Sequence, residues 1–226
     1  MKTKKNIIRL ICFAIALGIS FSSLYAEKSY TDDYYQYEKI EFDSEIKITM
    51  YFGEETEVKI PEMIEGLPVT VIGEESFAGN KIMTKVWVPS TVKKIEPNAF
   101  TWCPKLTEVY LDLAPVASIQ GTYDKDRYTI SVTGAFAYCQ ALKKVVIEEN
   151  CCSLYMGEGA FYGCSALETV IIPRSARNSS ENYGSKWPFI ECRALKTINF
   201  RGSSDENYFS GYTDPKITFN YDYIGE

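Results

Sequence analysis

The chain has 226 residues, of which 46% are hydrophobic and 14% are aromatic, and this composition excludes an intrinsically disordered protein. It contains 17 tyrosines and no histidine, so it lacks the commonest general base and the commonest zinc ligand. The formal net charge is −6. Without residues 1–26, which carry four basic residues and no acidic ones, 20 basic and 30 acidic residues remain. A charge of −10 with no basic cluster disfavours nucleic acid and anionic membranes as partners.

Residues 1–26 have the three parts of a secretory signal peptide. Four basic residues precede an apolar run over residues 10–19, and Ala26 is a small residue at the expected cleavage point. Leu24 is larger than usual for the −3 position, and an uncleaved anchor is the alternative interpretation. Because the apolar run is short for a membrane span of about 20 residues, we expect an exported protein. It would be secreted, displayed at the cell surface or periplasmic, with no membrane insertion after signal cleavage.

The next segments predict a lead-in followed by a cap. Residues 27–39 are acidic and rich in tyrosine without periodicity, and they predict a flexible lead-in. Apolar residues alternate with polar ones from Ile40 through Phe42 to Met50, as in a half-buried strand. Val58 begins a second extended segment that could pair back as a hairpin. We expect residues 40–72 to cover the N-terminal end of a stack.

Residues 73–200 repeat one pattern, seen most clearly in AFTWCPKLTEVYL at 99–111. A Phe is followed by a small residue at +3, Leu or Met at +6, Val or Ile at +9 and an apolar residue at +11. The pattern occurs five times, anchored at Phe77, Phe100, Phe136, Phe161 and Phe189. Self-similarity at a short fixed period is the sequence signature of a repeat array.

Each unit can be interpreted as a short strand, a crossing segment and a tight turn. In Val86-Trp87-Val88 the first and third side chains would point inward and the middle one outward. One helical or 3₁₀ turn would place the Phe and the +3 residue on the same face. A single unit cannot bury its own Phe and Leu, whereas stacked units bury a continuous core. We therefore expect one repeat domain over residues 40–221.

Two loops interrupt the period. The anchors are 23, 36, 25 and 28 residues apart, which places insertions within 113–129 and 174–186. Loops inserted at the same point of each coil gather on one side of a stack, often the side that binds. Tyr123 and Arg127 are the candidate binding residues in the larger loop. Residues 201–221 would form a C-terminal cap that ends in the alternating segment KITFNY, and residues 222–226 form a tail.

The cysteines follow the repeat. Four of the seven occupy the +3 position, namely Cys103, Cys139, Cys164 and Cys192. This position therefore serves the turn, where a small and partly apolar side chain fits, and not a disulfide scheme. A linear row of thiols cannot surround one metal ion, so no metal site is expected. Cys151 and Cys152 lie outside the register, and both a vicinal disulfide and a free thiol remain open there.

The repeat text is similar to a known bacterial family. The segments IPEMIEGLPVTVIGEESFAGN, VPSTVKKIEPNAFTWCPKLTEVYL and GEGAFYGCSALETVIIP resemble the BspA-type leucine-rich repeats of bacterial surface proteins. The resemblance implies a short-period leucine-rich repeat solenoid with a parallel β-sheet on the concave face. Short helical or 3₁₀ turns and loops would form its convex face, with β caps at both ends. For some members it also implies adhesion to host proteins or to other cells.

Equal offsets in neighbouring strands predict rows on the concave face, since strands stack about 4.8 Å apart. The +10 row is Trp87, Tyr110, Val146, Ile171 and Asn199. A mostly apolar row rimmed by charge is typical of a protein-binding surface, although strands favour such residues in any case. Asp112 and Glu148 would face each other from adjacent strands as an acidic rim for a basic partner.

These features predict a non-enzymatic binding module without a cofactor. The sequence contains no nucleophile elbow and no glycine-rich phosphate loop. The expected partner is a protein on a host or neighbouring cell, bound through the concave row and the inserted loops. A carbohydrate-binding protein or a periplasmic scaffold is the alternative, and the oligomeric state stays open.

Overall fold

The computed structural model describes residues 29–125, 130–151, 153–173, 187–201, 216–221 and 223. The predicted signal peptide and Cys152 lie outside these residues. The described part contains strands joined by turns, and no helix is found in it. The described residues therefore contain no helix that is long and apolar enough to cross a bilayer.

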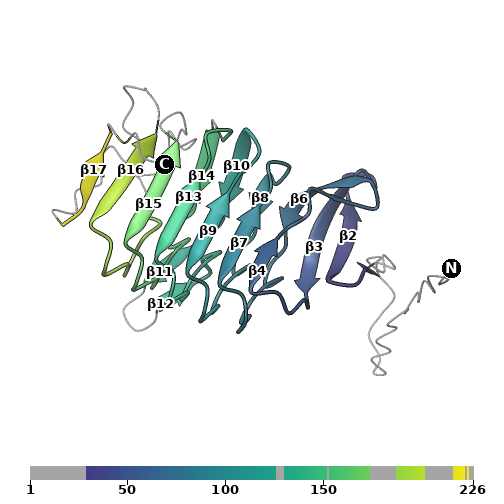
Figure 1. Cartoon of the computed structure of the whole chain (residues 1–226), viewed down its shortest axis with the longest axis horizontal. Helices are drawn as coiled ribbons and strands as arrows, with labels where there is room; N and C mark the ends of the chain where they lie inside the picture. The colour runs from purple at the N-terminus through teal and green to yellow at the C-terminus, as the bar shows by residue number, and fades with distance from the viewer. Residues whose placement is uncertain are drawn as a thin grey trace.

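Most strands belong to two sheets that run along the length of the molecule (Figure 1). The seven-stranded one, here called the repeat sheet, is parallel throughout. Its strands in spatial order are β4 (Glu57–Lys59), β7 (Lys85–Val88), β9 (Glu108–Leu111), β13 (Lys144–Ile147), β15 (Thr169–Pro173), β16 (Thr197–Arg201) and β17 (Thr218–Asn220).

The eight-stranded sheet is called the back sheet. Its strands in spatial order are β1 (Ser29–Thr31), β2 (Tyr35–Ile40), β3 (Glu45–Tyr51), β6 (Leu67–Ile72), β8 (Lys94–Ile95), β10 (Val116–Ile119) and β14 (Ser153–Met156), with β5 (Met63–Ile64) paired to β6. From β6 to β14 the chain alternates between the two sheets, so each repeat makes one coil of a solenoid.

The back sheet corrects the prediction for the far side of each coil. We expected short helical turns and loops there, and instead β6, β8, β10 and β14 pair in parallel. The segments alternate between buried and more exposed positions, as β10 and β14 do. This two-residue period favours an extended chain over a helical one. The prediction that the strands of the repeats form one parallel sheet is confirmed, and this sheet is the repeat sheet.

Stacked phenylalanines form the centre of the solenoid. The five anchor rings lie in one row, with centroid distances of 4.7, 4.8, 5.0 and 5.3 Å between successive rings. All five are at most 2% exposed. At the N-terminal end the row continues with Tyr51, whose ring stacks on Phe77 at 4.9 Å. Burying each ring contributes about 1.5–3 kcal/mol, and each aromatic pair adds about 0.5–1.5 kcal/mol.

The Phe segments are successive tight turns, and the predicted helical or 3₁₀ turns are not confirmed there. In the first unit the amide N–H groups of Ser76, Ala78 and Asn80 donate to carbonyls three residues earlier. The residue at +2 from each Phe has a left-handed backbone, with φ between 56° and 68°, which ends any helical geometry. These residues are Gly79, Trp102, Tyr138, Gly163 and Glu191.

The cysteines at +3 join neighbouring coils. The Cys139 thiol donates to the Phe100 carbonyl oxygen at 3.0 Å, and Cys103, Cys164 and Cys192 make the same contact with the Phe of the preceding unit at 3.2 Å. All four are buried and have free thiols, and Cys151 is also buried. In the first unit the Asn80 side chain instead accepts hydrogen bonds from the Ile82 and Met83 N–H groups. The interpretation that this position serves the turn is confirmed for these residues.

The N-terminal cap differs from the prediction. Residues 27–39 were expected to be a flexible lead-in, but β1 and β2 occupy most of this stretch, and Tyr35 and Tyr37 are buried. Burial of these alternating tyrosines explains the strand. β3 pairs with β2, and β4 pairs with β7, so the expected hairpin through Val58 is wrong. Phe42 is not a strand residue either, because it lies fully exposed in the β2–β3 turn.

The C-terminal cap contains the predicted last strand. β17 lies within the KITFNY segment and extends the repeat sheet in parallel from β16. The Tyr221 ring stacks on Phe200 at 4.9 Å and extends the apolar contacts beyond the fifth unit.

We expect Phe136→Ala, at the centre of the row, to lower the free energy of unfolding by about 3–5 kcal/mol, since it leaves a large cavity between two stacked rings. Phe136→Leu should cost clearly less because it keeps most of the volume. Urea denaturation followed by circular dichroism measures both changes. A loss below about 1 kcal/mol for Phe136→Ala would mean that the ring is not a core residue.

We also expect the four thiols at +3 to be unreactive in the folded protein, because they are buried and donate to backbone carbonyls. Iodoacetamide labelling with peptide mass mapping should modify them only after denaturation. Rapid labelling of the native protein, or a disulfide between any two of them, would contradict this packing.

Candidate functional site

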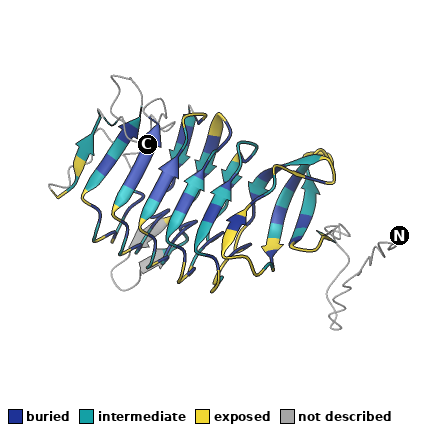
Figure 2. Cartoon of the chain, in the orientation of Figure 1, coloured by how far each residue is buried: buried dark blue, intermediate teal, exposed yellow. Residues whose placement is uncertain are grey.

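The outer face of the repeat sheet carries the predicted row. Trp87 pairs in register with Tyr110, Tyr110 with Val146, Val146 with Ile171, and Ile171 with Asn199. Lys59 on β4 and Asn220 on β17 extend the row at its two ends. Along the strands, inward residues such as Val86 and Val88 are buried while Trp87 and Tyr110 are only half-buried. Figure 2 shows the strands coloured in alternating buried and intermediate positions.

The two halves of this row differ in exposure. Val146 and Ile171 are only 2% and 1% exposed, so the expectation that they face a partner is wrong. The two residues are neighbours in the row, where they lie between Tyr110 and Asn199. Close by, the Arg201 guanidinium reaches across β15 to the carboxylate of Glu148, the residue that follows β13, at 2.9 Å. The apolar surface open to a ligand is therefore confined to the end that holds Trp87 and Tyr110.

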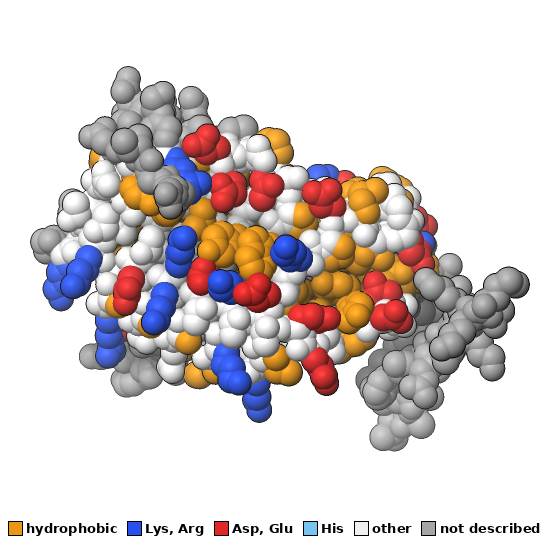
Figure 3. Space-filling model, viewed as in Figure 1, with side chains coloured by type: hydrophobic (Ala, Val, Ile, Leu, Met, Phe, Trp, Pro, Cys, Tyr) orange, Lys and Arg blue, Asp and Glu red, His pale blue; other side chains and the backbone are white. Residues whose placement is uncertain are grey.

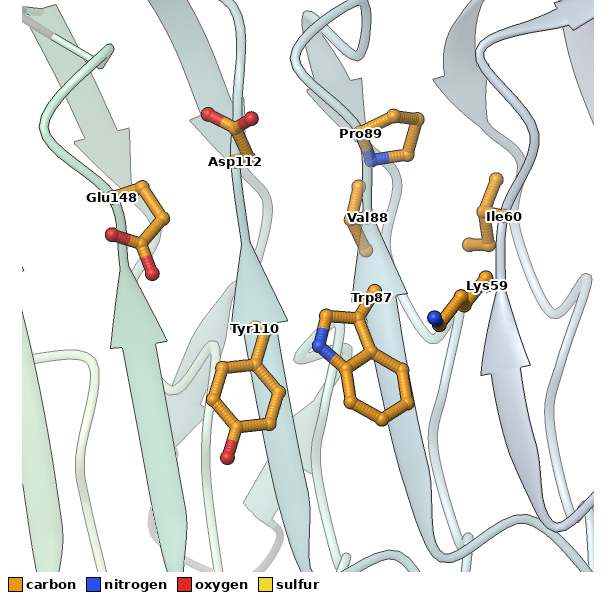
Figure 4. Close-up of a pocket in the computed structure, with 8 residues that line it drawn as sticks. All are labelled: Lys59, Ile60, Trp87, Val88, Pro89, Tyr110, Asp112 and Glu148. Carbon is orange, nitrogen blue, oxygen red and sulfur yellow. The ribbon is translucent and has the colours of Figure 1, made fainter.

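Trp87 and Tyr110 together form a pair of stacked aromatic rings, here called the platform. Their ring centroids lie 5.3 Å apart and their planes differ by 6°. Register creates this contact, because β7 and β9 place the two residues directly opposite each other. In Figure 4 both rings are seen open toward the viewer, over the strands that carry them. Lys59 Nζ lies 5.6 Å from the Trp87 centroid and Lys144 Nζ 5.5 Å from the Tyr110 centroid.

Charged residues hold the Tyr110 ring in place. Its hydroxyl donates a short hydrogen bond to the Glu108 carboxylate, and Lys85 Nζ lies 3.3 Å from the same carboxylate. The hydrogen bond from Tyr110 lowers the pKa of Glu108 below its usual value, and it outweighs burial, which acts in the opposite direction. The nearby Lys85 lowers this pKa further. Lys85, Glu108 and Lys144 follow one another in register, so these alternating charges fix the edge of the platform.

The two carboxylates beyond the platform are already engaged. Asp112 Oδ1 accepts a hydrogen bond from Asn150 Nδ2 at 2.7 Å, and Glu148 Oε2 accepts one from Arg201 Nη1 at 2.9 Å. The Arg201 charge offsets that of Glu148. The predicted acidic rim for a basic partner is therefore partly neutralised within the chain.

A shallow open pocket of about 350 Å³ lies between the platform and these carboxylates (Figure 4). It is lined by Lys59, Ile60, Trp87, Val88, Pro89, Tyr110, Asp112 and Glu148. Figure 3 shows the corresponding apolar patch near the middle of this face, surrounded by side chains of both charge signs. The structure thus brings together four predicted residues, Trp87, Tyr110, Asp112 and Glu148.

The remaining candidates lie elsewhere. Asn199 is half-buried farther along the row and accepts a hydrogen bond from Asn220 Nδ2 at 3.1 Å. Tyr123 begins β11 (Tyr123–Lys125), which pairs with β12 (Ile130–Val132) as an antiparallel hairpin at the turn edge of the solenoid (Figure 1). Arg127 lies outside the described residues.

Sequence reasoning did not select Lys59 and Ile60 at the pocket, nor the exposed Trp102 outside it. Lys59 and Ile60 line the pocket, but their segment was assigned to the cap, and only its parallel pairing with β7 brings it to the site. Trp102 lies at the turn edge, where it is 56% exposed and stacks on Tyr138 at 4.5 Å. Its position two residues after the Phe, which Gly79 and Gly163 occupy in other units, is the signal that could have revealed it.

The site offers binding groups, with no cluster for a metal. Within the described ranges no three His, Cys, Asp or Glu side chains are placed to hold an ion. What the pocket presents is an apolar surface, one free-standing amine at Lys59 near an aromatic face, and carboxylate oxygens. This combination suits non-covalent recognition.

The sequence matches the BspA-type leucine-rich repeat region in six copies, over residues 34–123 and 129–221. The chain belongs to this family. Six copies exceed the five phenylalanine units by one, and in the structure Tyr51 is the next ring of the row. A comparison with curated proteins gave no match.

Several solved bacterial leucine-rich repeat proteins are similar to this BspA-type chain. A leucine-rich repeat protein of T. pallidum is 24% identical with a TM-score of 0.56, over 76% of this chain and 71% of that one. One from Bacteroides capillosus is 26% identical with a TM-score of 0.43, over 77% of this chain and 99% of that one. A leucine-rich cell surface protein of Faecalibacterium prausnitzii is 24% identical with a TM-score of 0.37, over 76% of this chain and 54% of that one. The first of these likenesses supports the repeat fold.

The platform predicts a specific pH dependence. The hydrogen bond to Glu108, followed by burial, raises the pKa of Tyr110 to about 12. Unfolded tyrosine titrates near pH 10. The contribution of the protonated Tyr110 hydroxyl to folding stability is therefore fully present below about pH 10 and is lost as the pH rises toward 12. Over this range we expect the stability of Tyr110→Phe to fall less steeply than that of the wild type. Urea denaturation at several pH values tests this, and equal slopes would contradict it.

Proposed function

We propose that this BspA-type protein is an exported, non-enzymatic binding module that holds a protein partner on the outer face of its repeat sheet. The observation that carries the proposal is the Trp87–Tyr110 platform, a pair of aromatic rings left half-exposed on a face whose other apolar residues, Val146 and Ile171, are buried. Paired aromatic side chains at the centre of a polar rim are typical of binding hot spots.

Export is supported by residues 1–26, which have the composition of a signal peptide. An exported module without catalytic machinery acts through what it attaches to. We therefore propose that the partner is a surface protein of a host or of a neighbouring cell, and that the outcome is adhesion. The hairpin of β11 and β12 is proposed as an additional contact, since inserted loops of repeat arrays commonly take part in binding.

The rigidity of the site favours binding without rearrangement. Tyr110 is fixed by Glu108, and Trp87 is fixed by its stack on Tyr110 and by Lys59 above it. Side chains held in the binding conformation lose little entropy on association, which increases affinity.

The test is affinity capture with the exported protein immobilised, using extracellular proteins of the organism's surroundings. The partner recovered is then purified and its affinity for the wild type and for variants is measured. We expect Trp87→Ala and Tyr110→Ala each to weaken binding by about 30-fold, the size of a typical hot-spot loss of about 2 kcal/mol.

Trp102→Ala is the matched control, because Trp102 is also an exposed aromatic residue but does not line the pocket. It should bind like the wild type, and circular dichroism should show that all three variants are folded. Folded Trp87→Ala and Tyr110→Ala variants that bind the partner with unchanged affinity would refute the proposal.

A further inference from the structure

We propose that the platform binds a neutral pyranose ring, carried as a glycan by the partner. This inference rests on the proposed function, since it names the chemistry recognised at the same site. It goes further by assigning the pocket a ligand class that a protein surface alone does not require.

The shape of the exposed aromatic pair fits a sugar ring. The two rings are parallel within 6° and turn their faces outward over the sheet (Figure 4). The face of an aromatic ring carries partial negative charge. The axial C–H groups on one side of a pyranose are weakly positive and form a flat apolar patch, so they pack against such a face. Apolar side chains of a protein do not need two parallel aromatic rings.

The open apolar surface is small, which also fits a single sugar ring. The row becomes buried at Val146, one strand beyond Tyr110, so the exposed apolar surface covers only two rings. A stable protein interface commonly buries more than about 1,000 Å² in total. A pocket of about 350 Å³ lies instead at the lower end of the range for small-molecule sites, which is about 300–1,000 Å³.

The rim of the pocket carries both hydrogen-bond donors and acceptors, as sugar hydroxyls require. Lys59 offers an ammonium donor on one side of the pocket, and Asp112 and Glu148 offer carboxylate oxygens on the other. In each carboxylate one oxygen already accepts a hydrogen bond, from Asn150 or Arg201. Sugar hydroxyls both donate and accept hydrogen bonds, so one sugar ring can bond to the ammonium group and to the carboxylates of the rim at the same time. The floor between these groups is apolar, with Val88 1% exposed and Ile60 5% exposed.

The charged side chains around the pocket are of both signs, which favours a neutral ligand. An anionic ligand such as a phosphate would meet Asp112 and Glu148, and a cationic one would meet Lys59 and Lys144. Within the site, Glu108 is matched by Lys85 and Glu148 by Arg201. A ligand with hydroxyls and no net charge avoids both repulsions.

The experiment titrates the exported protein with a panel of neutral disaccharides, in α and β linkages, by ligand-observed nuclear magnetic resonance. We expect saturable binding of at least one of them, in the millimolar range usual for a single shallow site. Trp87→Ala and Tyr110→Ala should each weaken it at least tenfold. Trp102→Ala should leave it within twofold of the wild type, and glucuronate-containing disaccharides should bind more weakly than neutral ones.

A panel in which no neutral disaccharide binds overturns the inference, as does binding that survives in a folded Trp87→Ala variant. A separate arm distinguishes it from the proposed function, using the captured partner before and after enzymatic removal of its glycans. If the deglycosylated partner still binds through Trp87, the sugar is not the ligand while the binding function stands. If binding to the intact partner never depends on Trp87, the proposed function itself fails.

Discussion

The stacking of one phenylalanine on the next is the interaction on which the rest of this structure depends. The five anchor rings repeat at 4.7–5.3 Å, close to the spacing of about 4.8 Å between paired strands. A coil that matches this spacing can satisfy the ring row, the thiol hydrogen bonds and the strand pairing together. Insertions such as the one between Phe100 and Phe136 are tolerated because they leave the solenoid between a strand and the next turn.

Fixing the coils in this way also fixes what lies on the outer face. Since Phe77 stacks on Phe100, β7 and β9 are in register, and Trp87 must lie beside Tyr110. The platform is thus a consequence of the core, and it needs no loop to position it. The same register brings Lys59 from the cap against Trp87 and sets Glu108 between Lys85 and Lys144. A rigid scaffold thereby presents a preformed site, which reduces the entropy that binding must overcome.

The repeat, the register and the position of the platform residues could be predicted from the sequence because they depend on fixed offsets from each Phe. What could not be predicted depends on contacts between segments that are distant in the sequence. The burial of Val146 and Ile171 is one example, and the reach of Arg201 over 53 positions to Glu148 is another. The back sheet was missed because strands of two to four residues, such as β8, carry too few positions for a period to be recognised. The N-terminal tyrosines were assigned to a lead-in because aromatic residues flanked by acidic ones do not reveal their partners, here Tyr51 and Phe77.

We expect ligands to meet this protein at the Trp87 end of the platform and not at its two other tryptophans. The chain has three tryptophans, Trp87, Trp102 and Trp187, and each gives one indole N–H signal in a ¹⁵N-labelled sample. The most direct measurement follows these three signals while the captured partner, or a neutral disaccharide that binds, is added. We predict that the Trp87 signal moves in a saturable way while those of Trp102 and Trp187 stay in place. A shift of Trp102 or Trp187 with an unchanged Trp87 signal would contradict it.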